Sequence, residues 1–257
     1  MKRSKKIGLF RISDIWFDTD CFKGTNSRIT LLHTNNYLEE EFYDYKIVEK
    51  TLVLNIEIKI EDLMQKFDAK SCRYPIRKAV KDGVNVIRAK SETEYETYLS
   101  FENDFCKQKN IPGVSRNDLN DLDVYYAISP SGEYLGGCAF IVSESDELVR
   151  YKYGATLHKF NANEIILWKA ICDYREQGIK YFDFGGVIPT DDKNSYYYRH
   201  YHFKKKFGGE LVDSYIYCKI PGIYRPIYLM SNLILKIMFK GNLNEAINWL
   251  NRRGFVS

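Results

Sequence analysis

The sequence lacks the cysteine patterns that mark metal sites and disulfide frameworks. Its six cysteines are scattered over 257 residues, with no C-x-x-C pair and no cysteine–histidine cluster. Structural zinc sites use closely spaced cysteine and histidine ligands, and disulfide-rich secreted domains are short and dense in cysteine. We therefore predict no metal site, and buried reduced thiols in a cytoplasmic protein.

A long apolar run is missing as well. No stretch approaches the ~20 apolar residues that span a bilayer, and the basic N-terminus lacks the apolar stretch of a signal peptide. The nearest candidate, "IYLMSNLILKIMF" at 227–239, is interrupted by polar residues. It predicts a packed amphipathic helix. Peripheral contact with the inner face of a membrane through residues 226–240 is the alternative.

The charge balance is only mildly basic. A formal net charge of +4 is too small to indicate nucleic acid by itself, but it suits anionic ligands such as phosphates. Hydrophobic residues make up 45% and aromatic residues 15% of the chain, which is enough for a core rich in strands and aromatic packing. The length allows one large domain or two small ones.

The order of predicted elements indicates a mixed sheet. Residues 50–60 alternate in polarity as a strand does, and two helical segments follow before residue 84. Beyond that point we predict, in order, a strand, two helices, three strands, a helix, a strand, a helix and a strand, at 84–89, 92–110, 115–122, 123–129, 134–143, 148–156, 161–178, 180–187, 194–208 and 209–220. Two further helices are expected near 226–240 and 242–252. This order favours a sheet that is antiparallel first and partly parallel later.

Three short motifs lie along this order. The aromatic strand contains D-F-G-G at 183–186, and the helix after it ends in F-K-K-K-F-G-G at 203–209. Upstream, residues 73–84 read R-Y-P-I-R-K-A-V-K-D-G-V, in which Pro75 suits a first helical turn and Gly83 a helix end.

These motifs resemble those of the FemABX branch of the GNAT acyltransferase superfamily. In that branch a helix with a central tryptophan leads into a D-F-G-G strand, and the next helix ends in F-K-x-x-F-G-G. The resemblance covers about residues 50–215. It implies an α/β (α+β mixed sheet) GNAT-like acyltransferase fold, with a reduced N-terminal subdomain at 1–80 packed on the core, the acyltransferase core at 81–222 and a C-terminal helical extension at 223–257.

The resemblance also implies an enzyme. Members of the family transfer an amino acid from aminoacyl-tRNA to an amine of a peptidoglycan precursor, and related proteins use other donors, including acyl-CoA. We expect an N-acyltransferase or aminoacyltransferase that acylates an amine of a cell-envelope glycan or nucleotide-sugar precursor by direct attack. Its partners would be a small-molecule or lipid-linked glycan acceptor and a donor substrate, with no permanently bound cofactor.

Acyl-CoA and aminoacyl-tRNA are both candidates for the donor substrate. The usual GNAT pyrophosphate loop, Q/R-x-x-G-x-G/A, is replaced by "LHKFNAN" at 157–163. No long charged coiled-coil arm, which some members use for tRNA, is found either. A second hypothesis follows from the missing loop: a GNAT-like domain that has lost catalysis and binds RNA or an anionic glycan through its basic helices.

The resemblance places Lys204 at the family's lysine, which is thought to contact the reacting carbonyl or the donor phosphate. We expect Phe203 and Phe207 to pack around its ammonium. By lowering the local dielectric, the two rings would strengthen the electrostatic interactions of that ammonium. Asp183 is either a general base or the residue that holds the turn before the paired glycines.

Other predicted site residues come from the neighbouring elements. Tyr198 or Tyr201 is a candidate general acid, with packing as the alternative. His158, His200 and His202 are not spaced with an acid to form a nucleophile pair, so serine or cysteine nucleophiles are not expected. Predicted substrate contacts come from the diverging strands, the long helix and a basic helix whose alternative is a solvated face: Gly154, Gly185, Gly186, Trp168, Arg73, Arg77 and Lys78.

Overall fold

The computed structural model describes residues 2–7, 10–25, 28–157, 159–224 and 226. The chain divides into two compact units. One, here called the core unit, is Lys50–Asp213. The other, the split unit, combines Met1–Glu49 with Ser214–Ser257. The core unit nearly coincides with the region that carries the family resemblance.

The core unit contains six neighbouring strands in the order β4-β9-β8-β7-β6-β5. Strands β5 to β8 form an antiparallel meander, β8 pairs with β9 in parallel, and β9 pairs with β4 in antiparallel fashion. The expected sheet, antiparallel first and partly parallel later, is therefore confirmed. The bounds are β4 Tyr45–Asn55, β5 Asn85–Arg88, β6 Leu122–Ile128, β7 Tyr134–Ser143, β8 Leu148–Thr156 and β9 Tyr181–Val187.

The helices of this unit begin and end where local signals place them. Ser91 and Glu94 form a reciprocal capping box at the start of α4. Pro75 lies in the first turn of α3, and Gly83 follows that helix at φ +77°. The bounds are α2 Ile60–Lys66, η2 Ala69–Arg73, α3 Tyr74–Lys81, α4 Glu92–Lys109, η3 Arg116–Leu119, α5 Ala162–Glu176 and α6 Tyr198–Lys205.

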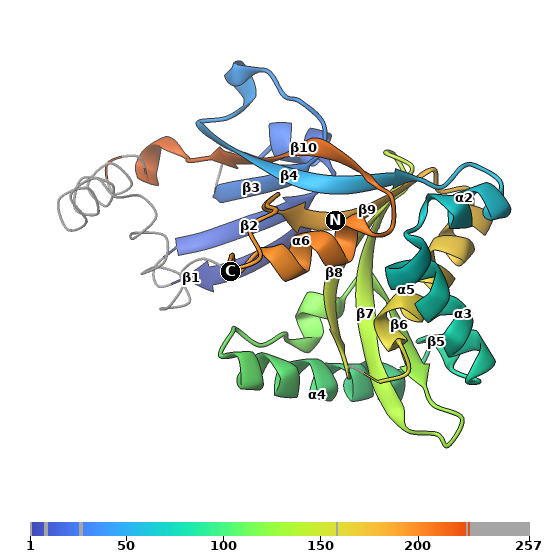
Figure 1. Ribbon diagram of the computed structural model, residues 1–257. Helices are drawn as coiled ribbons and strands as arrows, with labels where there is room; N and C mark the ends of the chain where they lie inside the picture. Colours follow the sequence, from blue (N-terminus) through green and yellow to red (C-terminus); the bar gives the residue numbers. More distant parts are fainter. Residues whose placement is uncertain (1, 8–9, 26–27, 158, 225, 227–257) are drawn as a thin grey trace. The chain divides into compact units, whose positions relative to one another are not determined.

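Helices α4 and α5 cover opposite faces of the meander (Figure 1). Phe140 of β7 packs its ring against Tyr174 of α5. Gly137, an odd number of residues away on the same strand, lies under the ring of Tyr98 of α4. Because successive side chains of a strand point to opposite faces, these two contacts assign one helix to each face.

The split unit has its own strands in the order β1-β2-β3-β10. Strand β2 pairs in parallel with β3, and β3 pairs in antiparallel fashion with β10. A small core closes on them, made of Ile15, Phe22, Leu32, Leu38 and Tyr217. The bounds are β1 Lys2–Ile7, β2 Phe10–Trp16, α1 Thr19–Lys23, β3 Ile29–Thr34, η1 Glu40–Phe42, β10 Glu210–Lys219 and η4 Gly222–Tyr224.

The two units divide the chain differently from the predicted domains. Sequence reasoning assigned no strand before residue 50 and set a boundary at residue 80. Residues 50–80 belong with the core unit because Leu52 and Leu54 of β4 and Ile76 of α3 are buried in the core that α5 completes. The predicted helices at 226–240 and 242–252 lie outside the described residues. Among the helices that are described, none is long and apolar enough to cross a membrane.

Candidate functional site

The D-F-G-G motif forms a bulge in β9. Asp183 pairs with Val53 of β4 while Gly186 pairs with Thr51, so β9 carries one extra residue between these pairs. The side chain of Asp183 is fully buried; it accepts hydrogen bonds from the Gly185 amide at 2.7 Å and from the Thr51 hydroxyl. Gly185 has φ +78°, a conformation that favours glycine at a bulge.

Parallel pairing between β8 and β9 ends at the same point. It joins Leu148–Arg150 to Tyr181–Asp183, whereas both strands continue for several residues beyond. The last pair, Arg150 and Asp183, is also a buried ion pair at 3.4 Å. The two strands thus stop sharing a ladder where the paired glycines begin, as expected for strands that separate around a ligand.

Lys204 of α6 reaches this end of the ladder. Its Nζ donates a hydrogen bond to the Gly186 carbonyl oxygen at 2.9 Å, and a Cβ on Gly185 would lie 3.5 Å from it. Burial lowers the pKa of Lys204 to about 8; the nearby carboxylate of Asp183 opposes this shift and Arg150 adds to it. The ammonium therefore lies beside a kinked backbone in a partly desolvated position.

The two phenylalanines that were predicted to lie around Lys204 contact Lys206. Lys206 places its Nζ 4.2 Å from the ring centroid of Phe203 and 5.6 Å from that of Phe207. The same ammonium lies 2.5 Å from a carboxylate oxygen of Glu164. Phe207 itself is fully buried and stacks on Phe184. The described ring contacts of Phe203 and Phe207 are thus with Lys206, whereas Lys204 reaches the Gly186 carbonyl, because α6 turns successive lysines to different sides.

The candidate acid and base residues are mostly engaged in packing. Tyr201 belongs to the buried core, with 9% of its surface exposed. Tyr198 is partly buried and places its ring 4.1 Å from that of His202. The contacts of Asp183 with Gly185 and Arg150 fit the turn-holding role better than that of a general base, because the carboxylate is enclosed and already satisfied.

The other predicted contacts are divided between packing and surface. The ring of Tyr151 fills the space that a side chain at Gly154 would need. Trp168 is partly buried and meets Phe67 edge-on at 5.5 Å. In the basic helix, Lys78 forms an ion pair with Asp82 at 2.8 Å. Nearby, Arg73 donates to Gln65, whereas Arg77 is exposed.

One residue near Lys204 was set aside by sequence reasoning. His200 lies one helical turn before Lys204 on α6 and is exposed. Burial of part of its ring, together with the charges of Lys204 and of Lys109 at the end of α4, lowers the pKa of His200. The available signal was its i, i+4 spacing from the family lysine, which places both side chains on one helical face.

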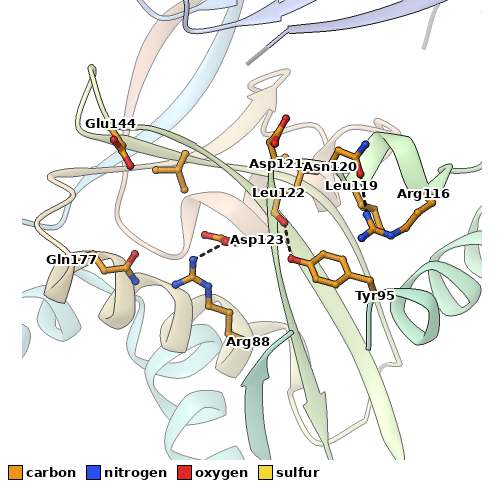
Figure 2. A pocket seen from close by; sticks show the side chains of 11 residues that line it. Arg88, Tyr95, Arg116, Leu119, Asn120, Asp121, Leu122, Asp123, Glu144 and Gln177 are labelled. Carbon is orange, nitrogen blue, oxygen red and sulfur yellow. Dashed lines mark hydrogen bonds and ion pairs between the residues drawn. The ribbon is translucent and has the colours of Figure 1, made fainter. Parts of the chain in front are cut away.

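A polar pocket of about 680 Å³ lies elsewhere in the core unit (Figure 2). Arg88 forms an ion pair in it with Asp123 at 2.7 Å, and Tyr95 donates to the Leu122 carbonyl. Arg116 forms two hydrogen bonds with the carboxylate of Glu92. None of the predicted site residues lines this pocket.

Comparisons with known proteins identify the fold. No family model matches the chain. The solved structure of FemX aligns with 89% of this chain and 85% of its own, with a TM-score of 0.63 and 14% identity. The structure of L-PGS from Bacillus licheniformis aligns with 89% and 83%, with a TM-score of 0.57 and 11% identity. The chain therefore shares the fold of FemX, as the motifs predicted.

A curated sequence relative points the same way over a shorter stretch. The Lipid II:glycine glycyltransferase of Staphylococcus haemolyticus is 31% identical over 101 residues, which are 38% of this chain. The match spans 23% of that protein, so the chain covers about a quarter of the curated relative.

Proposed function

We propose that the chain is an aminoacyltransferase that forms an amide bond on an amine of a peptidoglycan precursor. The observation that carries the proposal is the position of Lys204, whose ammonium lies beside Gly185 and Gly186 where β8 and β9 stop pairing. The named activity of the glycyltransferase relative supports the choice of acceptor class.

Lys204 suits the stabilisation of a tetrahedral intermediate. When an amine attacks an ester carbonyl, negative charge develops on the carbonyl oxygen, and a positioned cation in a partly dry site stabilises it. Lys204 is held by one hydrogen bond to a backbone carbonyl, so two of its three N–H groups are not used by that contact. They are available to the oxyanion of a reacting carbonyl.

The donor in this proposal is an aminoacyl ester rather than acyl-CoA. In GNAT enzymes the pyrophosphate of CoA meets the amides that begin the helix corresponding to α5. Here Glu164 lies in the first turn of α5 and is paired with Lys206. A carboxylate at a helix N-terminus already complements the positive end of the helix dipole. Aminoacyl-tRNA is the ester donor that the family resemblance suggests.

The acceptor is proposed to be a lipid-linked or nucleotide-linked muramyl peptide. Direct attack of the amine on the donor carbonyl requires no covalent intermediate on the enzyme. Contact with a membrane through 226–240 remains part of the proposal only as a way to reach a lipid-linked acceptor; those residues lie almost entirely outside the described range.

The experiment is a two-by-two transfer assay read by mass spectrometry. Purified chain is mixed with lipid II or its soluble UDP-linked pentapeptide precursor, and with either a mixture of aminoacyl-tRNAs or a mixture of acyl-CoAs. We expect the precursor to gain the mass of one or more amino-acid residues, and only when aminoacyl-tRNA is supplied.

The matched control compares two neighbouring lysines. Lys204→Ala should abolish the mass gain, whereas Lys205→Ala should retain it, because the exposed Lys205 ammonium lies over the Tyr201 ring rather than at the strand ends. Gain of an acyl group from acyl-CoA would overturn the donor assignment. Binding of tRNA without any transfer would favour the inactive RNA-binding domain instead.

A further inference from the structure

His200 is influenced by residues of α6, of the turn before it and of the end of α4. It occupies the same face of α6 as Lys204, and Tyr196 in the turn before the helix places its ring 5.9 Å from the imidazole. Lys109, at the end of α4, faces it from another element. Figure 1 shows α6 and α4 on the same side of β8. The imidazole and the Lys204 ammonium therefore belong to one face of α6 and are near enough for the charge of Lys204 to act on the ring.

The neighbours of His200 keep its ring neutral. Its pKa is lowered first by partial burial and then by the positive charges of Lys204 and Lys109. A charge on the ring would be repelled by both lysines, so the imidazole is mainly neutral at neutral pH, with a lone pair on one ring nitrogen. Exposure of the side chain leaves that lone pair accessible to a bound substrate.

We propose that His200 is the general base of the transfer reaction, accepting a proton from the attacking amine while Lys204 holds the carbonyl oxygen. The proposal rests on the proposed function. It replaces the tyrosine candidates of the sequence analysis, because Tyr201 is buried in the core and Tyr198 packs on His202.

The proton balance of the step is complete with an ester donor. The amine nitrogen forms the new C–N bond to the ester carbon and gives one proton to the imidazole of His200. The C–O bond of the ester then breaks, and the departing oxygen takes the same proton. A neutral amine and an ester thus become an amide and an alcohol with no net proton, whereas an acceptor that arrives as an ammonium first releases one proton to water.

The first test measures the ring itself and needs no substrate. The four histidines of the chain are followed by NMR through a pH titration, and Gln replacement of His200 assigns its signal. We expect its midpoint below the ordinary value of about 6.5, and we expect Lys204→Met to raise it. A midpoint near 6.5 that does not respond to Lys204→Met would overturn the proposal.

The second test measures the rate of aminoacyl transfer to the UDP-linked precursor as a function of pH. The base form exists above the midpoint of His200, so kcat should rise with pH through that midpoint. His200→Gln should lower kcat about 100-fold and remove the rising limb. His202→Gln is the matched control on the same helix. His202 packs on Tyr198 and lies 3.4 Å from Asp191, so in this variant kcat should still rise with pH.

The two failures are distinguishable. If His200→Gln transfers at the wild-type rate with an unchanged limb, His200 is not the base and the proposed function stands. If the wild-type chain transfers nothing while a lowered midpoint is observed, the proposed function fails and the role of His200 fails with it.

Discussion

In the polar pocket both arginines face carboxylates, whereas near the end of β9 the ring of His200 is influenced by two lysines. Arg88 is paired with Asp123 and Arg116 with Glu92. Near the strand ends, the positive charges of Lys204 and Lys109 both act on the ring of His200. The carboxylate nearest Lys204, that of Asp183, is already paired with Arg150.

This difference distinguishes charged side chains that stabilise the fold from charged side chains that act on a substrate. A paired cation has its field cancelled nearby, and it stabilises the fold to the extent that its geometry and burial allow. Unbalanced positive charge in a partly desolvated position is unfavourable for the fold, as the lowered pKa values of Lys204 and His200 indicate. Such a position becomes favourable when a substrate brings or develops negative charge.

The largest expected effect comes from replacing one unbalanced cation, Lys204, and one paired cation, Arg88, in separate variants. Lys204→Met should lower kcat by 100- to 1,000-fold with unchanged or slightly raised thermal stability, because a poorly solvated charge is lost. Arg88→Met should leave transfer intact but lower the free energy of unfolding by about 1 kcal/mol, because Asp123 loses its cation and keeps only the hydrogen bond from the Tyr174 hydroxyl. Transfer assays and urea unfolding of both variants measure the contrast. The opposite pattern would refute the distinction.

Lys206 is a second paired cation, and its side chain is more enclosed than that of Arg88. Its ion pair with Glu164 joins α6 to α5 and is largely enclosed, with side-chain exposures of 11% and 16%. Lys206→Met leaves a carboxylate without its cation, which costs about 3 kcal/mol in such settings.

The double variant with Glu164→Gln tests whether the loss of stability in Lys206→Met comes from the unpaired carboxylate of Glu164. Adding Glu164→Gln to Lys206→Met should recover most of the loss in urea unfolding. Equal losses in the Lys206→Met variant and the double variant would show that packing against Phe203, rather than charge, determines the effect.

Glu102 is a buried acid that no cation neutralises in the contacts described for it. Its side chain is 4% exposed and accepts a hydrogen bond from the Tyr98 hydroxyl at 3.2 Å. Burial raises its pKa to about 7, from an ordinary value of 4.5, and the bond from Tyr98 opposes the shift only in part. The folded chain therefore binds a proton that the unfolded chain releases between these two values.

Because the folded chain binds more protons than the unfolded chain in this pH range, its stability decreases as the pH rises. Stability should fall as pH rises from about 4.5 to 7, by about 2 to 3 kcal/mol in all, and should stay low above that range. Glu102→Gln should remove most of this dependence and stabilise the chain at pH 8. Urea unfolding at pH 5 and pH 8 of both proteins measures it; parallel pH dependence in the two would assign the trend to other groups.

Much of the core unit could be predicted from local sequence patterns. The cap at Ser91, the proline and glycine around α3 and the turns between β6, β7 and β8 are signals that act within a few residues. In the split unit such signals predicted β10 at 209–220 but none of the strands before residue 50. Its strand β3 pairs with β10, about 180 residues later in the chain, and no pattern within either segment records that partner.

The candidate site could be predicted only in its residue types. Three consecutive lysines on a helix point about 100° apart, so a motif cannot say which of them faces the strand ends. The structure turns Lys204 to Gly186, Lys205 over Tyr201 and Lys206 to Glu164. The role of His200 depends on Lys109, which lies about 90 residues earlier and reaches it only through the fold.

The smallest expected effect concerns the basic helix α3. Lys78 was predicted to bind substrate phosphates, but it is exposed and paired with Asp82 one turn away. If paired cations are structural, Lys78→Ala should change the KM for the UDP-linked precursor by less than twofold. Arg77→Ala serves as the comparison, because Arg77 is exposed on the same helix outside this ion pair. A tenfold rise in KM for Lys78→Ala would return α3 to the substrate site and would break the division between paired and unbalanced cations.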